Sequence, residues 1–341
     1  MNGQSLPTEN SAITLTVAIP TFNRRDSVVR AVLNLLPQTE TGCVSVLVSD
    51  NASTDGTAAA LVAVVESNAA CQVIAGDSNR GWWGQMERIA QHNTAEHVML
   101  LSDEDDVGDL SLLLDELAAS KPSFALPARK VAGRVNPASI WANATYLSGL
   151  VVQRQALVAA VSALETISRN SNNEFLTVYP QVAIIMLLWL RGDSGVILKN
   201  SPYASERQRL PGSWYPDPTW EVPTQLAQRI DSENPGRAAF KSLAYQLELL
   251  HDLSFLVESV APHFVEDAGP RTRLRRLLFR RWLAQRTAQL VDVQLAWQYP
   301  HIYDAYLGGV LRRHISPMRC VRRAMIAGGV RLRRFLRARI R

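Results

Sequence analysis

Long apolar stretches and cysteines are both scarce in this sequence. The longest uninterrupted apolar run, Val182–Leu190, has nine residues, about half of the roughly 20 that a membrane-spanning helix needs. Residues 1–11 are polar and lack the basic flank and apolar core of a secretory signal. The three cysteines, Cys43, Cys71 and Cys320, have no metal-ligand spacing. These absences predict a cytoplasmic protein with reduced thiols and no helix across the bilayer.

Lysine is absent from the C-terminal end, and acids are nearly absent there. Residues 271–341 contain 18 arginines, no lysine and two acids, which gives a charge of +16. Residues 1–270 carry −11, so the formal net charge of +5 conceals two regions of opposite sign. With 341 residues, 47% of them hydrophobic, the chain can bury a large core. We therefore expect a globular region with a basic appendage that meets a different partner.

Four consecutive acids, Asp103 to Asp106, lie one residue after the apolar segment His97–Leu101. Carboxylates so close together raise one another's pKa unless a cation lies among them. Carboxylate oxygens are the ligands that hard divalent cations prefer. We therefore expect Asp103 and Asp105, which can face the same side, to hold Mg²⁺ or Mn²⁺. The alternative is a solvated acidic loop without a metal.

Short apolar strands alternate with amphipathic helices along the N-terminal third of the chain. The first helix is expected to have Asp26 as its N-cap and to stop at Pro37. Alternation at about 30-residue spacing predicts an α/β fold with a doubly wound, mostly parallel sheet, which binds ligands at the carboxyl ends of its strands. The expected strands are Leu15–Ile19, Val44–Val48, Gln72–Ala75 and His97–Leu101.

The pattern is less regular after about residue 125. Trp141–Val152 is typical of a loop that enters a strand, and Asn170–Glu174 has N-cap chemistry before a helix over Phe175–Leu190. Ser201–Pro223 has five prolines and two tryptophans, which indicates an ordered aromatic loop. The remainder is helical in pattern. We expect three regions: 1–125 and 126–225 as the two halves of one domain, and 226–341 as a helical basic region.

Four polar segments at the expected strand ends carry a family resemblance. Val17–Arg24, Asp50–Thr57, Asn79–Gly81 and Leu100–Asp105 resemble, in order and spacing, family 2 glycosyltransferases of the GT-A fold over roughly residues 13–115. The resemblance implies a sugar nucleotide lying across the strand ends. It implies a metal on Asp103 and Asp105, and donor contacts from Pro20, Thr21, Asn23, Arg24, Asp50, Asn79, Gly81 and Asp103.

Two residues depart from the pattern of the family. Glu104 stands where relatives commonly have a third aspartate, which leaves both outer metal-binding positions intact. Gln85 stands where related sequences often have Asn, so an amide is kept. The resemblance places Asp50 near the base or ribose, and an acid at the end of a second strand can accept hydrogen bonds from a ribose hydroxyl on physical grounds as well.

The resemblance implies transfer of a sugar from a nucleotide donor, with inversion, to a hydroxyl of a glycan or lipid-linked acceptor in cell-surface polysaccharide synthesis. The metal would offset charge on the leaving diphosphate, and a carboxylate would take the acceptor proton. Glu174 is expected to be this base because it lies at a predicted helix start; Glu165 and Asp193 are the alternatives.

Three other functions stay open. The first is a catalytically inactive GT-A scaffold that binds nucleotide. The second is nucleic-acid binding, although the basic tail lacks a groove-reading module. The third is a sugar nucleotidyltransferase, which would need a glycine-rich phosphate loop after the first strand, where Pro20–Asn23 stands instead.

Arginines of the C-terminal region alternate with apolar residues, both in Arg271–Trp282 and in Arg319–Arg337. This pattern is typical of basic amphipathic helices that lie in a membrane interface, with arginines on anionic headgroups. The alternative is a solvated charged face on helices that pack against the acidic part of the chain. We expect a peripheral enzyme on the inner face of the cytoplasmic membrane, where a lipid-linked acceptor would be within reach.

Overall fold

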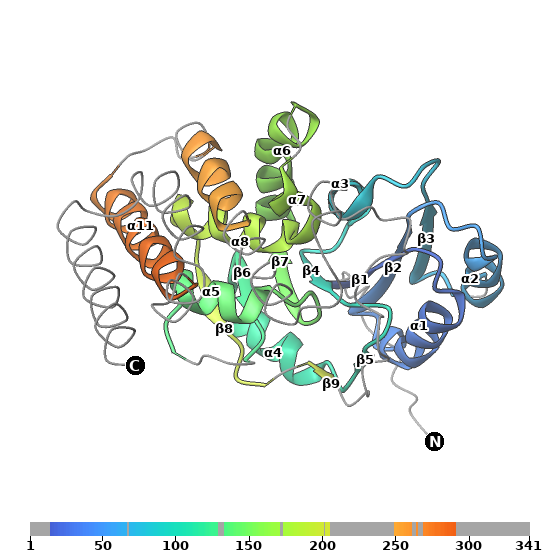
Figure 1. Cartoon of the computed structure of the whole chain (residues 1–341). Helices are drawn as coiled ribbons and strands as arrows, with labels where there is room; N and C mark the ends of the chain where they lie inside the picture. The colour runs from blue at the N-terminus through green and yellow to red at the C-terminus, as the bar shows by residue number, and fades with distance from the viewer. Residues whose placement is uncertain are drawn as a thin grey trace, which may run out of the picture. The chain divides into compact units, whose positions relative to one another are not determined.

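The computed structural model (Figure 1) describes residues 14–66, 68–128, 133–170, 173–200, 202–204, 249–260, 264 and 269–290. Most of the expected aromatic loop, Ser201–Pro223, and the second basic segment, Arg319–Arg337, lie outside the described residues. The chain divides into two compact units. The first comprises residues 1–207 and 256–272, and the second comprises residues 208–255 and 273–341.

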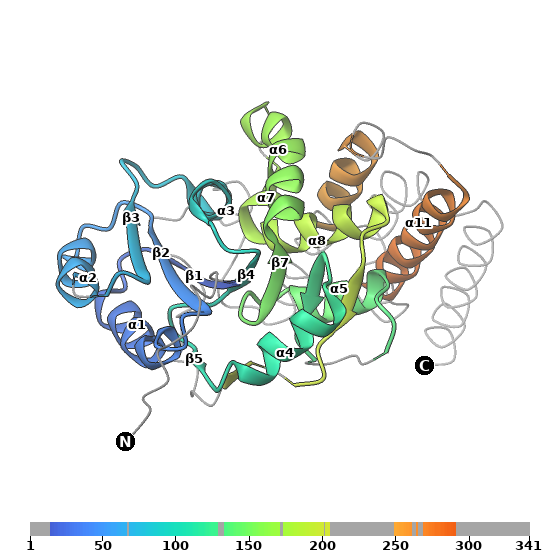
Figure 2. The ribbon, with the colours of Figure 1, turned by 180° about the vertical axis from the view of Figure 1, so that it is seen from behind.

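The first unit is built on a seven-stranded sheet with the order β3-β2-β1-β4-β7-β6-β8. The first four strands in this order are mutually parallel, whereas β7 is antiparallel to both β4 and β6. Strand β7 lies between β4 and β6 (Figure 1), and Figure 2 shows β7 beside β4 from behind. The expected α/β fold with a mostly parallel sheet is confirmed. The strands are β1 Leu15–Thr21, β2 Val44–Asp50, β3 Cys71–Ala75, β4 His97–Leu100, β6 Phe124–Leu126, β7 Leu150–Gln153 and β8 Gly195–Ile197.

Strand β1 is buried along its whole length because it lies inside the sheet with helices on both faces. Its near-continuous apolar sequence is typical of a parallel strand in that position. The strand runs two residues beyond the expected end, through Pro20 to Thr21. Proline is tolerated there because β4 pairs with β1 only as far as Ala18, so no ladder hydrogen bond to β4 is lost at Pro20. The extension brings Thr21 into register with Asp50 at the end of β2.

Helices cover both faces of the sheet, and α1 and α3 lie on opposite sides of β1 and β2 (Figure 1). One face packs its apolar side chains, such as Val17 and Val46, against Val32, Leu61 and Leu113 of three helices. These are α1 Arg25–Thr39, α2 Thr57–Val65 and α4 Ser111–Ser120. Helix α3 Gly81–His92 contacts three further helices: α6 Arg154–Asn170, α7 Glu174–Val178 and α8 Pro180–Arg191. Helix α5 Pro137–Ala144 packs on α8.

Helix α8 contains the longest apolar run of the sequence, and every residue from Pro180 to Leu190 is buried. An all-round apolar helix of this length belongs in a protein core. Within the described ranges, no helix is both long and apolar enough to cross a membrane.

Two expectations about helix ends were wrong. Asp26 is not the N-cap of α1; Arg24 occupies that position, and the backbone N–H of Arg25 donates to Asp55 Oδ2 at 3.1 Å. The helix also continues through Pro37 to Thr39. Proline costs little there because the helix ends two residues later, so only one hydrogen bond near its frayed end is lost.

The order of elements after residue 125 differs from expectation in two places. Residues 141–144 belong to α5, whose N-cap Asn136 forms a capping box that precedes Pro137. The expected single helix over Phe175–Leu190 is broken at Tyr179 into α7 and α8. The break follows from Pro180, because a residue before proline is driven out of the helical region.

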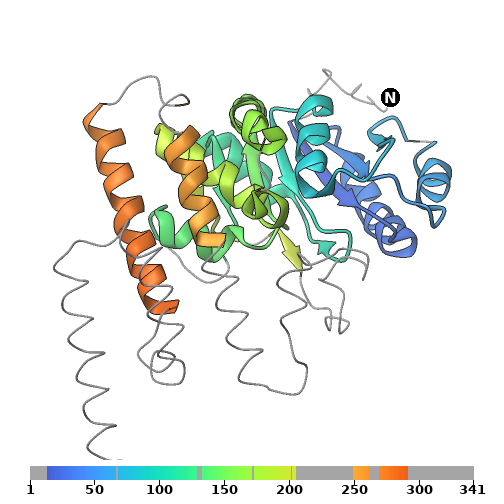
Figure 3. The ribbon, with the colours of Figure 1, turned by 45° about the horizontal axis from the view of Figure 1, so that its top comes forward.

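The second unit is described at residues 249–255 and 273–290, both helical, which agrees with the expected pattern there. Figure 3 shows α11, Pro270–Leu290, as one continuous helix. Phe279, Leu283 and Ala284 are buried on α11, whereas Leu274, Leu277 and Leu278 are exposed. A short two-stranded sheet in the first unit pairs β5 Asp106–Val107 with β9 Tyr203–Ala204.

Candidate functional site

The carboxyl ends of β1, β2 and β4 bring Thr21, Asp50 and Asp103 to one edge of the sheet. Thr21 Oγ1 donates a hydrogen bond to Asp103 Oδ2 at 2.8 Å. Asp50 and Asp103 are buried, with exposures of 1% and 4%. Ionised carboxylates are rarely buried without a partner, so this edge is built to receive hydrogen-bond donors or cations.

Arg24 lies against the acidic segment after β4. Its Nη1 is 3.2 Å from Asp103 Oδ1 and 2.6 Å from Glu104 Oε1. Burial raises the pKa of Asp103, while the charge of Arg24 and the hydrogen bond from Thr21 act in the opposite direction. The net direction is upward, so one arginine does not fully compensate the buried charge, and a further cation would stabilise the ionised form.

Asp105 is held by two hydroxyl groups that precede β7. Tyr146 Oη donates to the Asp105 carboxylate, at 2.9 Å from Oδ1 and 2.8 Å from Oδ2, and Ser148 Oγ donates to Oδ2. Ser148 Oγ also accepts from the backbone N–H of Ser102 at 2.8 Å. Tyr146 was missed in the sequence because its contact arises only when β7 pairs with β4.

The residues after β4 fit Mg²⁺ or Mn²⁺ in their chemistry. Asp103 and Asp105 are buried carboxylates, and their oxygens retain lone pairs beyond the hydrogen bonds they accept. In the described part of the chain, no group of three or more His, Cys, Asp or Glu residues could hold a metal ion. A metal at Asp103 and Asp105 would therefore take its other ligands from water and from phosphate oxygens of a substrate, as Mg²⁺ commonly does.

Hydrogen bonds join the loops after β1 and β2 to each other beside Asp50. Asp50 Oδ1 accepts hydrogen bonds from Ser53 N, at 3.2 Å, and from Ser53 Oγ. Asn23 N donates to Ser53 Oγ at 2.8 Å, and Asn23 Oδ1 accepts from Thr54 N at 2.8 Å. Asn23 has a φ of 51°, a left-handed conformation that asparagine tolerates better than most residues. Asn23, predicted as a donor contact, thus shapes the loop beside Asp50.

Asn79 and Gly81 reach the same edge through Asn51. Asn51 Nδ2 donates to Asn79 Oδ1 at 2.7 Å, and the same oxygen accepts from Gly81 N at 2.9 Å. Gly81 has a φ of 63°, which a side chain would strain. The predicted residues Asn79 and Gly81 therefore form one turn, which is hydrogen-bonded to the end of β2 through Asn51, a residue that was not predicted to have this role.

Gln85 is buried beneath the site. Its Oε1 accepts from Ser49 Oγ and from Arg88 Nη1, and its Nε2 donates to the Thr21 carbonyl at 2.9 Å. Burial lowers the pKa of the Arg88 guanidinium, the nearby charge of Arg80 lowers it further, and Asp50 and Glu87 raise it. Arg88 was not predicted as a site residue. Its charge on the buried face of α3 was the feature of the sequence that could have indicated a role.

The candidate bases differ in their placement. Glu174 begins α7, which Asn173 caps by accepting from Leu176 N, and α7 packs against α3. Asp193 precedes β8, and β8 is parallel to β6 and antiparallel to β7, so Asp193 lies at the amino-end edge of the sheet, opposite Asp103. Its carboxylate is paired with Arg191 at 2.6 Å. Of these two residues, only Glu174 lies next to an element that starts in the site.

The fold and the site define an α/β domain with buried acids at the carboxyl ends of its parallel strands, where such sheets bind ligands. Residues 16–159 match the family model for glycosyl transferase family 2. This segment is a glycosyl transferase family 2 domain.

Comparison with solved structures gives distant likenesses. Mannosyltransferase PcManGT from Pyrobaculum calidifontis, in complex with GDP-Man and Mn²⁺, is 13% identical over 86% of this chain and 83% of its own, with a TM-score of 0.45. TarS 1-349 of S. aureus is 12% identical in its complex with UDP, over 84% of this chain and 92% of its own, with a TM-score of 0.46. In its complex with UDP-GlcNAc, TarS 1-349 is 15% identical over 85% of this chain and 88% of its own, with a TM-score of 0.45. The comparison with curated proteins gave no match.

Proposed function

We propose that this protein is a metal-dependent, inverting glycosyltransferase. It would move a sugar from a nucleotide donor to a hydroxyl of a glycan or lipid-linked acceptor, in cell-surface polysaccharide synthesis. The observation that supports this most directly is the convergence of two acidic positions on one sheet edge: Asp50 at the end of β2, and Asp103 with Asp105 after β4. One position suits the nucleoside of a donor and the other suits its diphosphate.

At the nucleoside end, Asp50 is the recognition group. Ser53 engages its Oδ1, and the remaining carboxylate lone pairs can accept from a ribose hydroxyl or a base N–H. At the diphosphate end, Arg24 offers a guanidinium that already pairs with Asp103. Mg²⁺ or Mn²⁺ bound by Asp103 and Asp105 would supply the charge that stabilises the departing diphosphate.

A thermal-shift screen of UDP-, dTDP- and GDP-sugars, with and without Mn²⁺, tests the donor and metal together. We expect one nucleotide class to raise the melting temperature only when Mn²⁺ is present, and EDTA to abolish turnover. Asp105→Asn should slow transfer by about a hundredfold or more, the typical loss when a transition-state stabiliser is removed. Asp106→Asn is the matched control, since Asp106 belongs to the same acidic run but pairs outward with Asn34 Nδ2 at 2.8 Å.

Full turnover in EDTA would overturn the metal assignment. Stabilisation by a nucleotide without any donor hydrolysis or transfer would favour the alternative, an inactive scaffold that binds nucleotide.

We further propose Glu174 as the base that deprotonates the acceptor hydroxyl. Its support is positional: it begins α7, beside α3, which itself begins at Gly81 in the site. Glu174→Gln should leave donor affinity unchanged and slow transfer about a hundredfold or more, as loss of a general base does. Glu165→Gln, on α6, is the comparison. If Glu174→Gln transfers at the wild-type rate while Glu165→Gln does not, the base is Glu165.

Peripheral membrane binding is the remaining part of the proposal. Three leucines of α11, Leu274, Leu277 and Leu278, are exposed at 54%, 62% and 39%. They lie within two turns of one another, with the exposed arginines 273, 280 and 281 around them. Leucines that enter the interface beside arginines that meet anionic headgroups would hold the enzyme at the inner face of the cytoplasmic membrane.

A further inference from the structure

We propose that Arg88 is a positioning residue that holds the nucleoside end and the diphosphate end of the donor site in a single arrangement. The inference depends on the proposed function, because it assigns Arg88 a role in binding the nucleotide donor. Arg88 lies on α3, is buried at 7% exposure, and does not belong to any of the strand-end motifs.

The Arg88 guanidinium donates to three separate acceptors near the end of β2 and on α3. Nη1 is 3.1 Å from the Asp50 carbonyl and 3.1 Å from Gln85 Oε1, and Nη2 is 2.8 Å from Asn51 Oδ1. Longer contacts reach Ser49 Oγ at 3.4 Å and the Ser78 carbonyl at 3.5 Å. A planar fork of donors can serve these acceptors at once, which a lysine ammonium on its flexible stem cannot.

One set of hydrogen bonds leads from Arg88 to the nucleoside end. The Asp50 carbonyl also accepts from Gly76 N at 2.8 Å, which ties the loop after β3 to the end of β2. Asn51 Oδ1 also accepts from Arg80 N at 3.1 Å, and Asn51 Nδ2 holds Asn79. Arg88 thus fixes the backbone that carries Asp50 and the turn opposite it.

A second set leads to the diphosphate end. Gln85, whose Oε1 accepts from Arg88, donates through Nε2 to the Thr21 carbonyl at 2.9 Å. Thr21 Oγ1 in turn donates to Asp103 at 2.8 Å. The arginine is therefore connected by buried hydrogen bonds to both acids that would flank the donor.

Gly76 leaves room for the guanidinium. A Cβ built at Gly76 would lie 2.5 Å from Arg88 Nη2 and 2.7 Å from its Cζ, far inside normal contact distance. Gly76→Ala would therefore displace the Arg88 guanidinium while every residue that accepts a hydrogen bond from it stays unsubstituted. Gly108→Ala is the matched control, because a Cβ at Gly108 meets nothing within 4 Å.

The test measures binding of UDP, GDP and dTDP to the full chain by calorimetry, with and without MnCl₂. The variants are Arg88→Met, Gly76→Ala and Gly108→Ala, and melting curves establish the folded fraction of each. We expect the first two to weaken nucleoside diphosphate binding about tenfold or more, as loss of several charge-assisted hydrogen bonds would. The gain in affinity on adding Mn²⁺ should also shrink, while Gly108→Ala stays at the wild-type value. If Arg88→Met does not fold, Arg88→Lys, which keeps the buried charge, replaces it.

A merely structural arginine would lower the melting temperature and leave the affinity of the folded protein unchanged, which would overturn the inference. Weaker nucleotide binding with an unchanged Mn²⁺ effect would overturn the connection to Asp103. If the wild-type chain binds none of the three nucleotides, the proposed function fails and the inference fails with it.

Discussion

The carboxylate of Asp105 owes its orientation to residues far along the chain. Tyr146 and Ser148, which donate to it, are 41 and 43 residues away in sequence. Tyr146 Oη reaches both carboxylate oxygens, so it holds the group symmetrically and opposes rotation. Under the proposed metal site, Tyr146 would orient a metal ligand, and groups that do so tune the affinity for the metal.

Tyr146→Phe should therefore weaken Mn²⁺ binding by about tenfold or more in the presence of nucleoside diphosphate. Calorimetric titration of Mn²⁺ into the folded chain measures this loss directly. Ser120→Ala serves as the control, because the Ser120 hydroxyl donates to the Glu116 carbonyl on the exposed surface of α4. Wild-type affinity in Tyr146→Phe would show that the phenol does not position a metal ligand.

Single residues of the site were predictable where the signal was local. Asp50, Asp103 and Asp105 each follow a recognisable buried strand, so sequence alone brought them to one edge. Tyr146 and Arg88 were not predictable, because their contacts depend on which strands become neighbours and on which face of α3 is covered. The donor contacts and the base role of Glu174 stay predictions.

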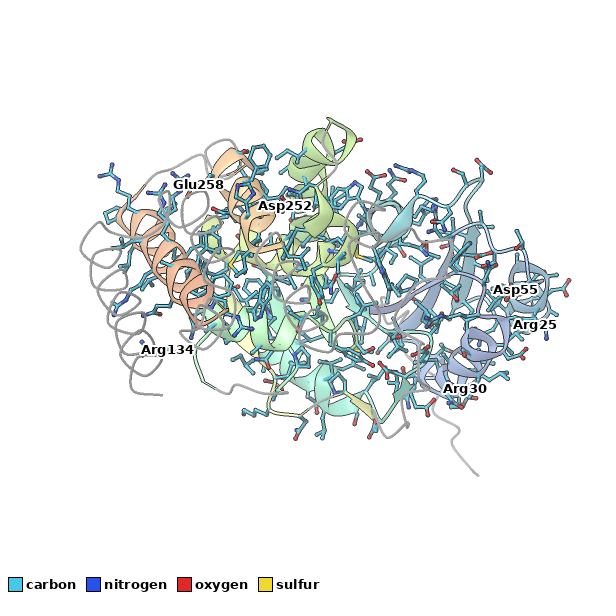
Figure 4. All side chains as sticks on the ribbon, viewed as in Figure 1. Arg25, Arg30, Asp55, Arg134, Asp252 and Glu258 are labelled. Atoms are coloured by element: carbon cyan, nitrogen blue, oxygen red, sulfur yellow. The ribbon has the colours of Figure 1, made fainter. Side chains whose placement is uncertain are left out.

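Helices α1 and α2 begin on the two sides of one carboxylate. Asp55 Oδ2 accepts from Arg25 N at 3.1 Å, and its Oδ1 accepts from Thr57 N at 3.1 Å and from Thr57 Oγ1. Figure 4 shows Arg25 and Asp55 next to each other. Partial burial raises the pKa of Asp55, but the hydrogen bonds from Thr57 and Arg25 outweigh it and hold the value below the usual range. One acid thus satisfies free N–H groups at two helix starts.

Asp55→Ala should lower the free energy of unfolding by about 1 to 2 kcal/mol, the usual cost of losing a helix cap. Because the folded pKa is depressed, the full difference exists above the unfolded Asp value of about 3.9. The difference should shrink as the pH falls through the lower folded value, since a protonated carboxyl caps weakly. Urea unfolding at several pH values measures it.

Asp26→Ala is the control for this pair of helices. Asp26 was expected to cap α1, but its side chain is 87% exposed and pairs with Arg25. Its loss should cost about 0.5 kcal/mol. A larger cost for Asp26→Ala than for Asp55→Ala would contradict the assignment of the cap.

Elements with a strong hydrophobic periodicity and clear end signals in the sequence were predictable, and the others were not. The strands β1 to β4 are short apolar runs ended by polar loops, so their type and approximate residue ranges were predicted correctly. The strands β6 and β8 have three residues each, too few for a periodic signal, and α6 was not distinguished from its surroundings. Apolar content alone predicted one helix over Phe175–Leu190, but Pro180 separates α7 from α8.

At the scale of the whole molecule, the contrast between an acidic N-terminal part and a basic C-terminal part predicts salt-dependent membrane binding. The full chain should sediment with anionic vesicles, dissociate as ionic strength rises, and bind far less when truncated before Arg271. A triple substitution of Leu274, Leu277 and Leu278 by serine should reduce binding by at least about tenfold, since each buried leucine contributes roughly 1.5 kcal/mol or more.

The matched control replaces three equally exposed apolar residues elsewhere, Leu33, Val62 and Leu112, which are 49%, 53% and 60% exposed. If both triple variants lose binding equally, or if none of the proteins binds vesicles, α11 is not a membrane surface. A solvated charged face would then explain the arginines.

The place of β7 in the sheet determines when the enzyme can become complete during its synthesis. This strand inserts between β4 and β6, yet it follows both of them in sequence. The ribosome therefore releases Asp103 and Asp105 well before the segment that carries Tyr146 and Ser148. Until that segment emerges, β4 has an unpaired edge and Asp105 lacks the hydroxyls of Tyr146 and Ser148 that hold its carboxylate. A nascent chain that stops short of β7 can bring Thr21 and Asp50 together at the sheet edge, but it cannot complete the surroundings of Asp105.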